Sequence, residues 1–489
     1  MTIFLITLVL LGLELPCILA AITAECETLL KLLPGKVWSR ASERYEESIS
    51  SCFYVQGRAL PACIVAPALP HDISVIVQLL AKSRSPFAIR SGGHASQPGA
   101  ANVENGITID LRSLKEVKLY KKGDVVSVGP GALWGDVYDI LDKRGLAVLG
   151  GRDAHVGVGG LTLGGGISFF SPERGFACDS VTNFQIVLAD GTITDANATF
   201  NSDLFVALKG GTNNFGIVTR FDIKTFSQGQ LWGGAITYPE TVFPQLAAAF
   251  TETKQPKNFD PYQALETIFV YLGQLQTYLG VASLFYSKPL VNASSLKPFT
   301  SIQPQISNSM RLSSTVQLAR EVSSLGTPNL YSVWATTTFA ITPDIISRII
   351  SIWKSTALSM QQVTNITTSM TFQSIPPPPS VLSPNVLGFL PGSTPHKNLV
   401  LMLLSTFFEE STAYEQIDML TKGFFAAVDE VAEDEGGNRE YTYLNYAAKW
   451  QRPLKDYGMV QWSYLAIKSR KYDPNGVFQR QVGGFKIFA

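Results

Sequence analysis

Charge is what this chain has little of. Only 16% of its 489 residues are charged, and the 39 Lys and Arg residues balance the 39 Asp and Glu residues. A balanced chain without a basic run lacks the electrostatic surface that binds nucleic acid, so we expect no nucleic-acid partner. The hydrophobic fraction of 46% excludes a disordered chain, and the length allows two or more domains with ample cores.

Histidine and cysteine are also scarce, which bears on metal binding. The chain has four histidines and five cysteines, and no Cys-x-x-Cys pair occurs. The histidines show no spacing typical of metal ligands; they are His71, His94, His155 and His396. The sequence therefore predicts no metal site.

Long apolar runs are missing except at the N-terminus. Residues 3–13 are apolar, and small residues follow at 20–24, so residues 1–24 are predicted to be a secretory signal peptide. The segment before the apolar run has no Lys or Arg, and an uncleaved anchor is the alternative. Glu14 and Pro16 shorten the run below the ~20 residues that a membrane span needs. We therefore expect a secreted monomer without stable membrane insertion.

Two further features agree with secretion. Sequons predict N-glycosylation at Asn197, Asn292 and Asn365. Without the leader, four cysteines remain, which allows one or two disulfides in an oxidising compartment; they are Cys26, Cys52, Cys63 and Cys178. We favour the Cys26–Cys63 pair, because both residues flank the start of the first domain.

The sequence pattern of the chain changes near residue 229. Residues 25–228 are rich in glycine and short strands, and residues 229–440 alternate longer strands with amphipathic helices. In the first part we expect helices at 71–81 and 133–144, strands at 86–89, 107–111, 125–128 and 216–223, and a hairpin at 183–194. In the second part we expect strands of one sheet at 279–286, 331–339, 369–373 and 399–408, with helices at 343–360 and 413–432 on one face. Pro376–Pro379 is interpreted as a polyproline spacer, and the class is α+β.

A short glycine motif follows the strand expected at 86–89. Residues 90–96 read Arg-Ser-Gly-Gly-His-Ala-Ser. Adjacent glycines allow a sharp turn whose N–H groups can form a concave site for a pyrophosphate. By itself the motif is weak evidence, and a tight surface turn with a solvent-facing imidazole is the favoured interpretation.

A second glycine cluster occupies residues 150–166. So many glycines cannot form an ordinary helix or strand, which suggests backbone wrapped closely around a flat or elongated ligand. The Rossmann fingerprint is absent, because no strand-Gly-x-Gly-x-x-Gly-helix unit has an acidic residue ~20 positions further on. A Walker motif is absent too, so the phosphate cradle is of another kind.

These motifs occur in one order with several others, and together they carry a family resemblance. The others are 128–131 with Trp134-Gly135, 176–179, 187–191, 208–218, 443–446 and 471–478. The chain resembles the FAD-linked oxidases of the vanillyl-alcohol-oxidase superfamily, which have a PCMH-type FAD-binding domain. It is most similar to the berberine-bridge-enzyme-like branch in its fungal secreted form. The likeness covers nearly the whole mature chain, although residues 229–440 match only in general texture.

The resemblance implies a fold and a cofactor site. It implies an FAD domain of two α+β subdomains at 25–228, a substrate domain with a large antiparallel sheet backed by helices at 229–440, and a C-terminal segment at 441–489 that returns to the FAD domain. The residues it assigns to FAD are Arg90, Ser91, Gly92, Gly93, His94, Ala95, Ser96, Gly151, Val156, Gly157, Gly159, Gly160, Gly164, Gly165, Gly216, Ile217, Val218 and Asn445.

The resemblance also implies how the flavin is attached. In the family, the histidine at the position of His94 bonds covalently to the flavin. Many members carry a second link from a cysteine, and Asp153 occupies that position here. We therefore expect attachment through His94 alone, and Cys178 should not replace the missing cysteine. His155 could face the flavin or substrate, but a structural role in the loop is favoured.

Asn445 and Tyr446 resemble a catalytic pair that reaches back to the flavin ring. Tyr446 could take a proton from the substrate as hydride leaves, with Lys449 or Arg452 as a nearby cation; the alternative is a core tyrosine. The family's carboxylate base has no clear counterpart in this sequence. Glu266 is the one acidic residue inside a strand-like run of the substrate region, which is too little to assign it a role.

The function implied is that of an FAD-dependent oxidase. It would remove hydride from a small organic substrate, either a secondary-metabolite alcohol or amine or a sugar, with O₂ as acceptor and H₂O₂ as product. The alternatives are a dehydrogenase with another acceptor, an oxidative cyclase of secondary metabolism, and a non-catalytic binding protein on the same scaffold.

Overall fold

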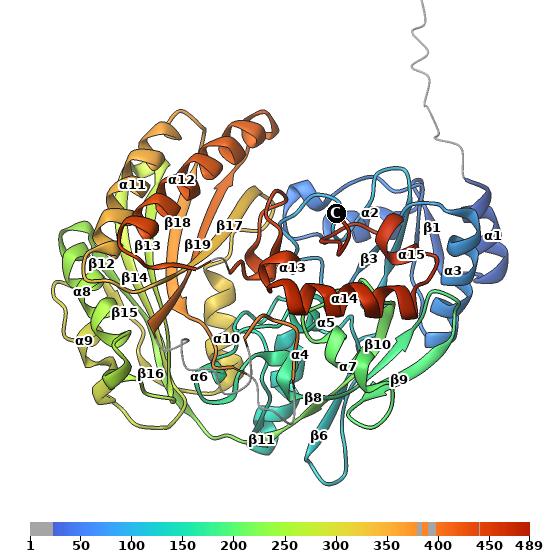
Figure 1. The fold of residues 1–489 in the computed structure, drawn as a ribbon, viewed down its shortest axis with the longest axis horizontal. Coiled ribbons are helices and arrows are strands. Elements are labelled where there is room, and N and C mark those ends of the chain that lie inside the picture. The colour runs from blue at the N-terminus through green and yellow to red at the C-terminus, as the bar shows by residue number, and fades with distance from the viewer. Residues whose placement is uncertain (1–22, 379–383, 390–397, 440) are drawn as a thin grey trace, which may run out of the picture.

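A computed structural model describes residues 23–378, 384–389, 398–439 and 441–489 of this chain. Nearly all of the expected signal peptide lies outside these residues, as do His396 and the last residue of the polyproline spacer. The described chain forms two lobes that meet along a broad contact (Figure 1). None of its helices is long and apolar enough to cross a membrane.

The first lobe contains two small sheets. One has the order β1-β2-β4-β3, and β4 pairs in parallel with both neighbours; the strands are β1 Val37–Ser39, β2 Cys63–Val65, β3 Phe87–Arg90 and β4 Ile107–Asp110. The other has the antiparallel order β5-β6-β10-β8-β9; the strands are β5 Val117–Leu119, β6 Val125–Val128, β8 Val181–Val187, β9 Ile193–Asn197 and β10 Ile217–Lys224. A third pair joins β7 Leu146–Ala147 to β11 Phe226–Ser227.

Helices cover both sheets of this lobe. They are α1 Ala24–Leu32, α2 Glu43–Ser50, α3 Pro70–Ser83, α4 Trp134–Leu141, α5 Val158–Leu163, α6 Ser171–Arg174 and α7 Ser202–Leu208. Helix α3 shows why they form. Pro70 begins the helix, the Asp72 carboxylate accepts from the N–H groups of Ala68 and Leu69 just before it, and the stripe of apolar residues expected from the sequence is buried.

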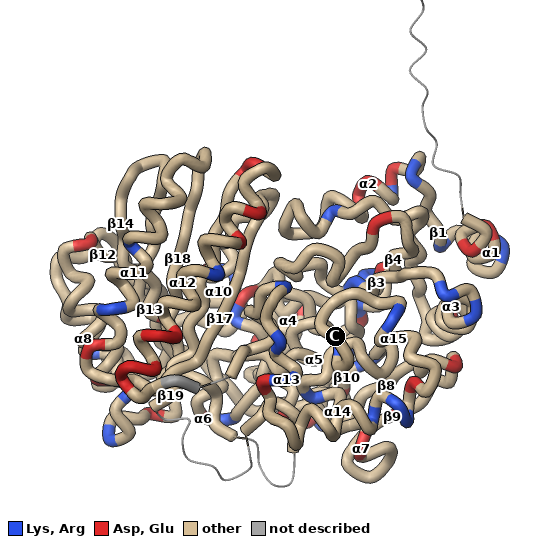
Figure 2. Tube along the Cα trace, turned by 45° about the horizontal axis from the view of Figure 1, so that its top comes forward, with Lys and Arg blue, Asp and Glu red and all other residues tan. Residues whose placement is uncertain are grey.

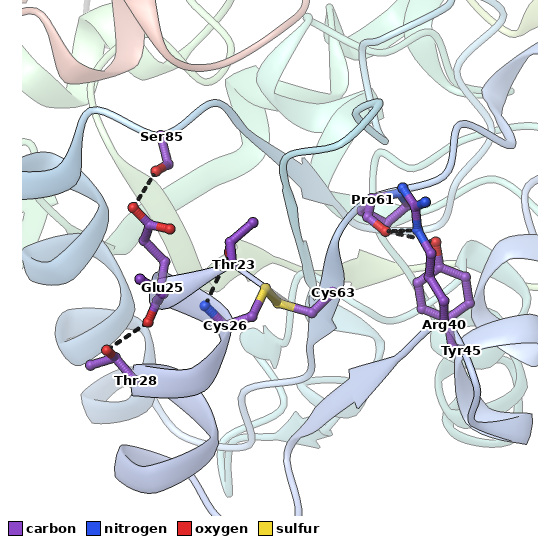
Figure 3. Close-up of a disulfide and its surroundings, with 10 residues drawn as sticks. Thr23, Glu25, Cys26, Thr28, Arg40, Tyr45, Pro61, Cys63 and Ser85 are labelled. Atoms are coloured by element: carbon purple, nitrogen blue, oxygen red, sulfur yellow. Dashed lines mark hydrogen bonds between the residues drawn. A yellow bond between two sulfur atoms is a disulfide. The ribbon is translucent and has the colours of Figure 1, made fainter. Parts of the chain in front are cut away.

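A disulfide joins Cys26 in α1 to Cys63 in β2, the pair that the sequence favoured (Figure 3). The Thr23 side chain accepts from the Cys26 N–H and so caps α1 where the disulfide begins. Cys52 and Cys178 are free and buried. The disulfide thus ties the first described helix to the first sheet.

The second lobe is one large sheet, of nine strands in the described chain. Its order is β15-β12-β14-β13-β18-β19-β17-β20, with β16 beside β12, and neighbours run antiparallel. The long strands are β12 Leu231–Pro239, β13 Gln263–Leu272, β14 Thr277–Tyr286, β17 Tyr331–Ala340, β18 Thr367–Ser374 and β19 Leu399–Phe408. The short ones are β15 Ser307–Asn308, β16 Arg311–Ser313 and β20 Asn438–Arg439. The four strands expected from the sequence do belong to one sheet, and β12 and β13 extend it.

Helices pack on the outer face of this sheet (Figure 1). They are α8 Phe243–Thr253, α11 Ile345–Ser359 and α12 Tyr414–Asp434, and the lobe also holds α9 Lys297–Thr300 and α10 Thr315–Ser324. Alternate strand residues such as Phe269, Phe372 and Met402 join these helices in one core. The residues between them form the opposite, inner face, which meets the first lobe. There the Phe285 ring lies 4.4 Å from that of Phe169.

After the sheet, the chain crosses back to the first lobe. Its helices there are α13 Pro453–Asp456, α14 Met459–Tyr472 and α15 Val477–Arg480 (Figure 1). The Tyr464 and Tyr472 hydroxyls and the Lys468 and Lys471 ammonium groups all bind Asp203. The two lobes are thus closed by a segment that begins in one and ends in the other.

Candidate active site between the lobes

The two glycine motifs lie directly against each other. A Cβ atom on Gly92 would stand 2.6 Å from the Gly157 Cα, and one on Gly159 would stand 2.9 Å from the Ser91 Oγ. The Ser91 hydroxyl donates to the Pro130 carbonyl and holds the first motif in place. Only glycine permits this approach, so segments more than sixty residues apart form one backbone cradle.

Arg90 supports this cradle from beneath. Its side chain is fully buried and donates to the Ser48 carbonyl and the Ser51 hydroxyl, with Asp110 4.0 Å away. Gly93 has a φ of 71° and takes the turn above the guanidinium. The side chain of Arg90 therefore faces the protein interior, and only its backbone is available to a bound group.

His94 follows this turn with an unsatisfied nitrogen. Its Nε2 is buried and has no hydrogen-bond partner in the described chain, and the rings of Phe53 and Tyr54 pack 4.2 and 5.5 Å from the imidazole. Burial lowers the His94 pKa, although the charge of Asp153 opposes this. The neutral imidazole is the nucleophilic form. A buried, unpartnered nitrogen at the cradle fits the attachment of a group that the chain itself does not provide.

Asp153 and His155 form a local turn beside His94. The Asp153 carboxylate accepts from the Ser323 hydroxyl at 2.5 Å and from the His155 N–H at 2.7 Å. The imidazole of His155 is exposed. The His155 backbone therefore belongs to the hydrogen bonding of this loop, and the role of its imidazole stays a prediction.

The other residues assigned to the cofactor fall into two groups. Val156, Ala95 and Ser96 are half-buried or exposed along the cradle, and the Ser96 carbonyl accepts from Gln56 at 2.7 Å. Gly160 is exposed, and a Cβ there would meet nothing within 4 Å. The buried Gly151, Gly164 and Gly165 belong to the second glycine motif. Gly216, Ile217 and Val218 are also buried, but they lie at the start of β10 beside β8.

Asn445 connects the C-terminal segment to the second glycine motif. Its amide donates to the Leu161 carbonyl at 3.0 Å and to the Tyr443 hydroxyl at 3.1 Å. A Cβ on Gly164 would collide with the Asn445 side chain, at 2.0 Å. Asn445 therefore holds the turn Leu444–Tyr446 against the cradle, and its contacts are those of a positioning residue.

Tyr446 projects from this turn into a polar cluster that spans both lobes. The Arg152 Nη2 lies 3.0 Å from the Tyr446 hydroxyl, 2.8 Å from the Gln373 Oε1 and 3.0 Å from the Glu266 Oε1. The Gln373 amide also donates to the Tyr446 hydroxyl, at 3.4 Å. Glu266 and Gln373 are paired neighbours on β13 and β18, so their side chains share the inner face.

The electrostatics of the cluster centre on the phenol. Burial raises the Tyr446 pKa, and so does the charge of Glu266, whereas Arg152 lowers it. Burial also works against the charge on Arg152, but Glu266 and Tyr446 outweigh it and raise the Arg152 pKa. The expectation that Lys449 or Arg452 supplies the cation is wrong. Lys449 instead pairs with Glu415 at 3.3 Å.

Sequence reasoning missed Arg152 and Gln373. Arg152 lies inside the second glycine motif, where a charged residue beside so much glycine is a usable signal. Gln373 carries none, because an uncharged residue in a strand gives no chemical clue. Glu266 stands out in the sequence as a lone acidic residue in a strand. Its partner comes from the other lobe and is not visible in the sequence.

Aromatic rings link this cluster to His94. The Trp334 ring lies 5.8 Å from Tyr446 and 5.9 Å from Tyr54, which packs edge-on against His94. Phe407 stacks on Tyr54 at 6.2 Å. The cradle and the Tyr446 cluster therefore belong to one site between the lobes.

Comparison with known proteins decides the family. Residues 61–197 match the model of an FAD binding domain. The chain is 34% identical to the FAD-dependent monooxygenase sdcF of Emericella nidulans, over 94% of this chain and 98% of that protein. It is 31% identical to the FAD-dependent monooxygenase drtC of Aspergillus calidoustus, over 96% of this chain and 91% of that protein. The chain belongs to the FAD-linked oxidoreductases of the vanillyl-alcohol-oxidase and berberine-bridge-enzyme-like type.

Solved structures share the whole fold. 6-Hydroxy-D-nicotine oxidase from Arthrobacter nicotinovorans has a TM-score of 0.79 at 20% identity, covering 93% of this chain and 98% of that one. Xylooligosaccharide oxidase from Myceliophthora thermophila has a TM-score of 0.76 at 23% identity, covering 94% and 99%. These likenesses confirm the α+β class and the PCMH-type FAD-binding fold.

The protein is thus an FAD-linked oxidoreductase, and its residues fit the cofactor. The glycine cradle, the open space at Gly160 and the buried, unpartnered His94 Nε2 are compatible with a bound FAD. In the described part of the chain, no group of three or more metal-binding side chains could hold a metal ion.

Proposed function

We propose that this enzyme oxidises a small organic molecule at a carbon bearing oxygen or nitrogen, with O₂ as acceptor and H₂O₂ as product. The observation that carries the proposal is the position of the Tyr446 hydroxyl, which Arg152 and Gln373 hold on the side of the site that faces the cradle. FAD supplies the electron chemistry when bound, since it accepts a hydride equivalent and is reoxidised by a second substrate. The large sheet and the glycine cradle would enclose the substrate and the FAD from opposite sides.

Tyr446 would accept the proton that the substrate loses. Only the phenolate form of Tyr446 can accept a proton, and the raised pKa keeps most of the phenol protonated at neutral pH, so a cation that favours phenolate is needed. Arg152 is that cation, because its Nη2 faces the phenol oxygen at 3.0 Å. Gln373 fixes the orientation of the same oxygen. The substrate hydroxyl or amine would bind next to Tyr446, with its C–H directed at the cradle.

Replacing Tyr446 by phenylalanine tests this assignment. The variant should retain its FAD and slow anaerobic flavin reduction by about 10²–10⁴-fold, the range for loss of a general base. Stopped-flow absorbance at the flavin band measures the rate. Reduction at the wild-type rate would return Tyr446 to a packing role.

Reoxidation of the reduced enzyme in air, with H₂O₂ assayed, tests the electron acceptor. Slow reoxidation would favour a dehydrogenase.

Covalent attachment through His94 alone is the second part of the proposal. Glucooligosaccharide oxidase from Acremonium strictum, which shares this fold, carries a 6-S-cysteinyl, 8α-N1-histidyl FAD, whereas Asp153 stands at the expected cysteine position here. Wild-type protein should keep its flavin through acid precipitation, and His94→Ala should lose it. Peptide mass mapping should find flavin on the His94 peptide only. A flavinylated Cys178 peptide would contradict the proposal.

Oxygen insertion is a second candidate, because the relatives at 31–34% identity are named monooxygenases. Turnover under ¹⁸O₂ separates the two. An oxidase leaves the label in H₂O₂, and a monooxygenase puts one labelled atom into the organic product. An oxidative cyclase would be recognised by a new ring in the product.

We also propose that the enzyme is secreted as a glycosylated monomer. The Cys26–Cys63 disulfide supports an oxidising compartment. Asn292 and Asn365 are exposed, although the Asn365 amide donates to Glu409 at 3.0 Å. Asn197 is half-buried, its amide donates to Asn183, and its oxygen accepts from Thr199. We therefore expect glycan at Asn292 and Asn365, with Asn197 the poorest acceptor. Glycosidase treatment of the secreted protein and peptide mapping would test this, and sedimentation would test the monomer.

A further inference from the structure

The C-terminal segment forms a cavity outside the site between the lobes. The cavity has a volume of about 460 Å³, and it is lined by the end of α14, by α15 and by the segment that follows α15. None of the residues assigned to the cofactor or to the Tyr446 cluster lines it. It is therefore a second concave site on the same protein.

Three basic side chains line this cavity. Arg470 lies in the last turn of α14, Arg480 ends α15, and Lys486 lies in the segment that follows. Figure 2 shows Lys and Arg positions in blue close to the marked end of the chain at α15. Among the described residues, none of the three makes an ion pair within 4 Å. Lys486 donates to the Asn213 amide oxygen at 2.8 Å, and Arg480 donates to the Asn475 carbonyl.

Carboxylates compensate these cations only in part. Asp473 also lines the cavity, but it is 2% exposed, and its two oxygens accept the N–H groups of Val477 at 2.8 Å and Phe478 at 2.7 Å. The first turn of α15 thus binds this carboxylate, which acts on Arg480 and Lys486 only through space. Ala489 is exposed beside the cavity and pairs with none of the cations in the described structure. Positive charge is therefore in excess.

The ammonium of Lys486 is the least satisfied of these charges. Burial lowers the pKa of Lys486 to about 7, although the charge of Asp473 opposes this. The other charged side chains of the cavity, Arg470 and Arg480, are cations and give the ammonium no support. An anion bound beside Lys486 would favour the charged form and restore its proton.

The cavity also has an unsatisfied hydroxyl and an apolar side. Ser469 is 1% exposed, and its Oγ has no hydrogen-bond partner in the described chain. A buried hydroxyl without a partner costs free energy, which fits a site that a ligand completes. Phe488 lines the cavity as well, and the Arg470 guanidinium lies 5.2 Å from the centre of its ring. The volume and the ring suit a ligand larger than a bare ion.

We propose that this cavity binds a small organic anion. Its carboxylate or phosphate group would lie among Arg470, Arg480 and Lys486, and its apolar part would lie against Phe488. Arginine matches both groups, because its fork of N–H donors can form two parallel, charge-assisted bonds to either one. The cavity lies apart from the Tyr446 cluster, so this inference does not depend on the proposed oxidation.

Calorimetric titration of the FAD-loaded enzyme tests the proposal. The probes are benzoate, phenyl phosphate and benzamide, which is the neutral counterpart of benzoate. We expect at least one of the two anions to bind about tenfold tighter than benzamide, since only an anion compensates the cations. Tighter binding of phenyl phosphate would assign a phosphate monoester, and tighter binding of benzoate a carboxylate. Benzamide binding as tightly as both anions, or no binding of either anion, overturns the proposal.

Variants locate the bound anion. Arg470→Gln and Arg480→Gln should each weaken the anion about tenfold, with the flavin spectrum and turnover unchanged. Arg44→Gln, at an exposed position of α2, removes the same charge elsewhere and is the control. An anion that perturbs the flavin spectrum and binds both cavity variants normally would lie in the active site, which overturns the proposal.

Ser469→Ala separates binding from folding. It should leave the melting temperature of the free protein unchanged or raise it, because it removes an unsatisfied hydroxyl, and it should weaken the anion. If an arginine variant does not fold, this variant decides the location. Unchanged anion affinity in a folded Ser469→Ala would then overturn the proposal.

The pH dependence of benzoate binding tests the place of Lys486. Benzoate does not titrate near neutral pH, so its affinity should fall as pH rises above 7 and Lys486 loses its proton. At pH 7, titrations in two buffers of different ionisation enthalpy should show uptake of about half a proton on binding. Lys486→Gln should abolish the uptake. Benzoate binding without proton uptake in the wild-type enzyme would overturn the placement of the anion beside Lys486.

Discussion

Arg152 determines how the phenol of Tyr446 can work. One guanidinium nitrogen contacts the phenol, the Gln373 amide and the Glu266 carboxylate within 3.0 Å. Arg152 and Glu266 are both largely buried, with side chains 9% and 14% exposed. Removing either partner alone leaves the other charge uncompensated, which costs about 3–5 kcal/mol in typical buried pairs. The pair is therefore best probed by a change that keeps the shape of the carboxylate.

Glu266→Gln is that change, and we expect it to alter the pH dependence of flavin reduction. The Glu266 charge raises the Tyr446 pKa, and the amide removes this influence while Arg152 remains. Proton acceptance by Tyr446 improves as pH rises towards its pKa, so a lower pKa moves the rising limb of the rate profile to lower pH. A shift of about one unit is expected for a charge at this range. Stopped-flow reduction across pH measures it.

The control for this shift is Glu415→Gln. Glu415 is 80% exposed and pairs with Lys449, close in sequence to Tyr446 but outside the cluster. It should leave the profile unchanged, because exposed pairs are screened by solvent. An unchanged profile in Glu266→Gln, with flavin still bound, would show that Glu266 only holds Arg152 in place.

At the scale of elements, the cradle depends on glycines for two different reasons. Gly92 and Gly157 are needed because their backbones touch. Gly160 has open space around it and sits inside α5, where alanine would stabilise the helix by about 0.5–1 kcal/mol. Packing within the described chain therefore gives no reason for glycine at 160. The space that the absent side chain leaves is suited to the cofactor.

Gly160→Ala should therefore reduce FAD loading without disturbing the fold. We expect the flavin-to-protein absorbance ratio of the purified enzyme to fall by more than half, with an unchanged far-UV circular dichroism spectrum. Gly229→Ala is the control, since a Cβ there also meets nothing within 4 Å and the residue lies in the loop before β12, outside both glycine motifs. Full loading in Gly160→Ala would mean that the open space is not part of the cofactor site.

Elements with strong periodicity were predictable from the sequence. The helix expected at 71–81 is α3, and the strand expected at 399–408 is β19 with the same bounds. β12 contains two glycines and was not foreseen as a strand, and the run around Glu266 that forms β13 was interpreted as strand-like but without bounds or a place in the sheet. Each of these strands pairs with a strand on either side, and this pairing holds it in the extended conformation. The local sequence pattern does not reveal such pairing.

At the scale of the whole molecule, the cradle could be predicted from the sequence, but the contacts that build the Tyr446 cluster beside it could not. The cradle lies within continuous motifs, so sequence order was enough to find it. The Tyr446 cluster combines Arg152 from one lobe, Glu266 and Gln373 from the other, and a turn that returns from the sheet to the first lobe. Contacts between segments this far apart depend on how the lobes pack, and no local pattern encodes them.

The Cys26–Cys63 disulfide acts at this scale too, because it closes the chain of the first lobe. It joins residues 37 apart, and it connects α1 to the sheet that ends in the cradle. A link of this span limits the unfolded chain and typically contributes about 2–4 kcal/mol to the free energy of unfolding. The double variant Cys26→Ala with Cys63→Ala should lose about that amount in urea denaturation.

Flavin fluorescence should report the loss, since FAD lies in the lobe that the disulfide closes and its emission changes as the cradle opens. In the presence of a reductant, the unfolding midpoint of the wild-type enzyme should move towards that of the double variant, provided that the reductant reaches the disulfide as the lobe unfolds. Lys31→Gln, at an exposed position of the same helix, is the control and should leave the transition in place. An unchanged midpoint in the double variant would show that the packing of Cys26 and Cys63 holds α1 on the sheet without the bond.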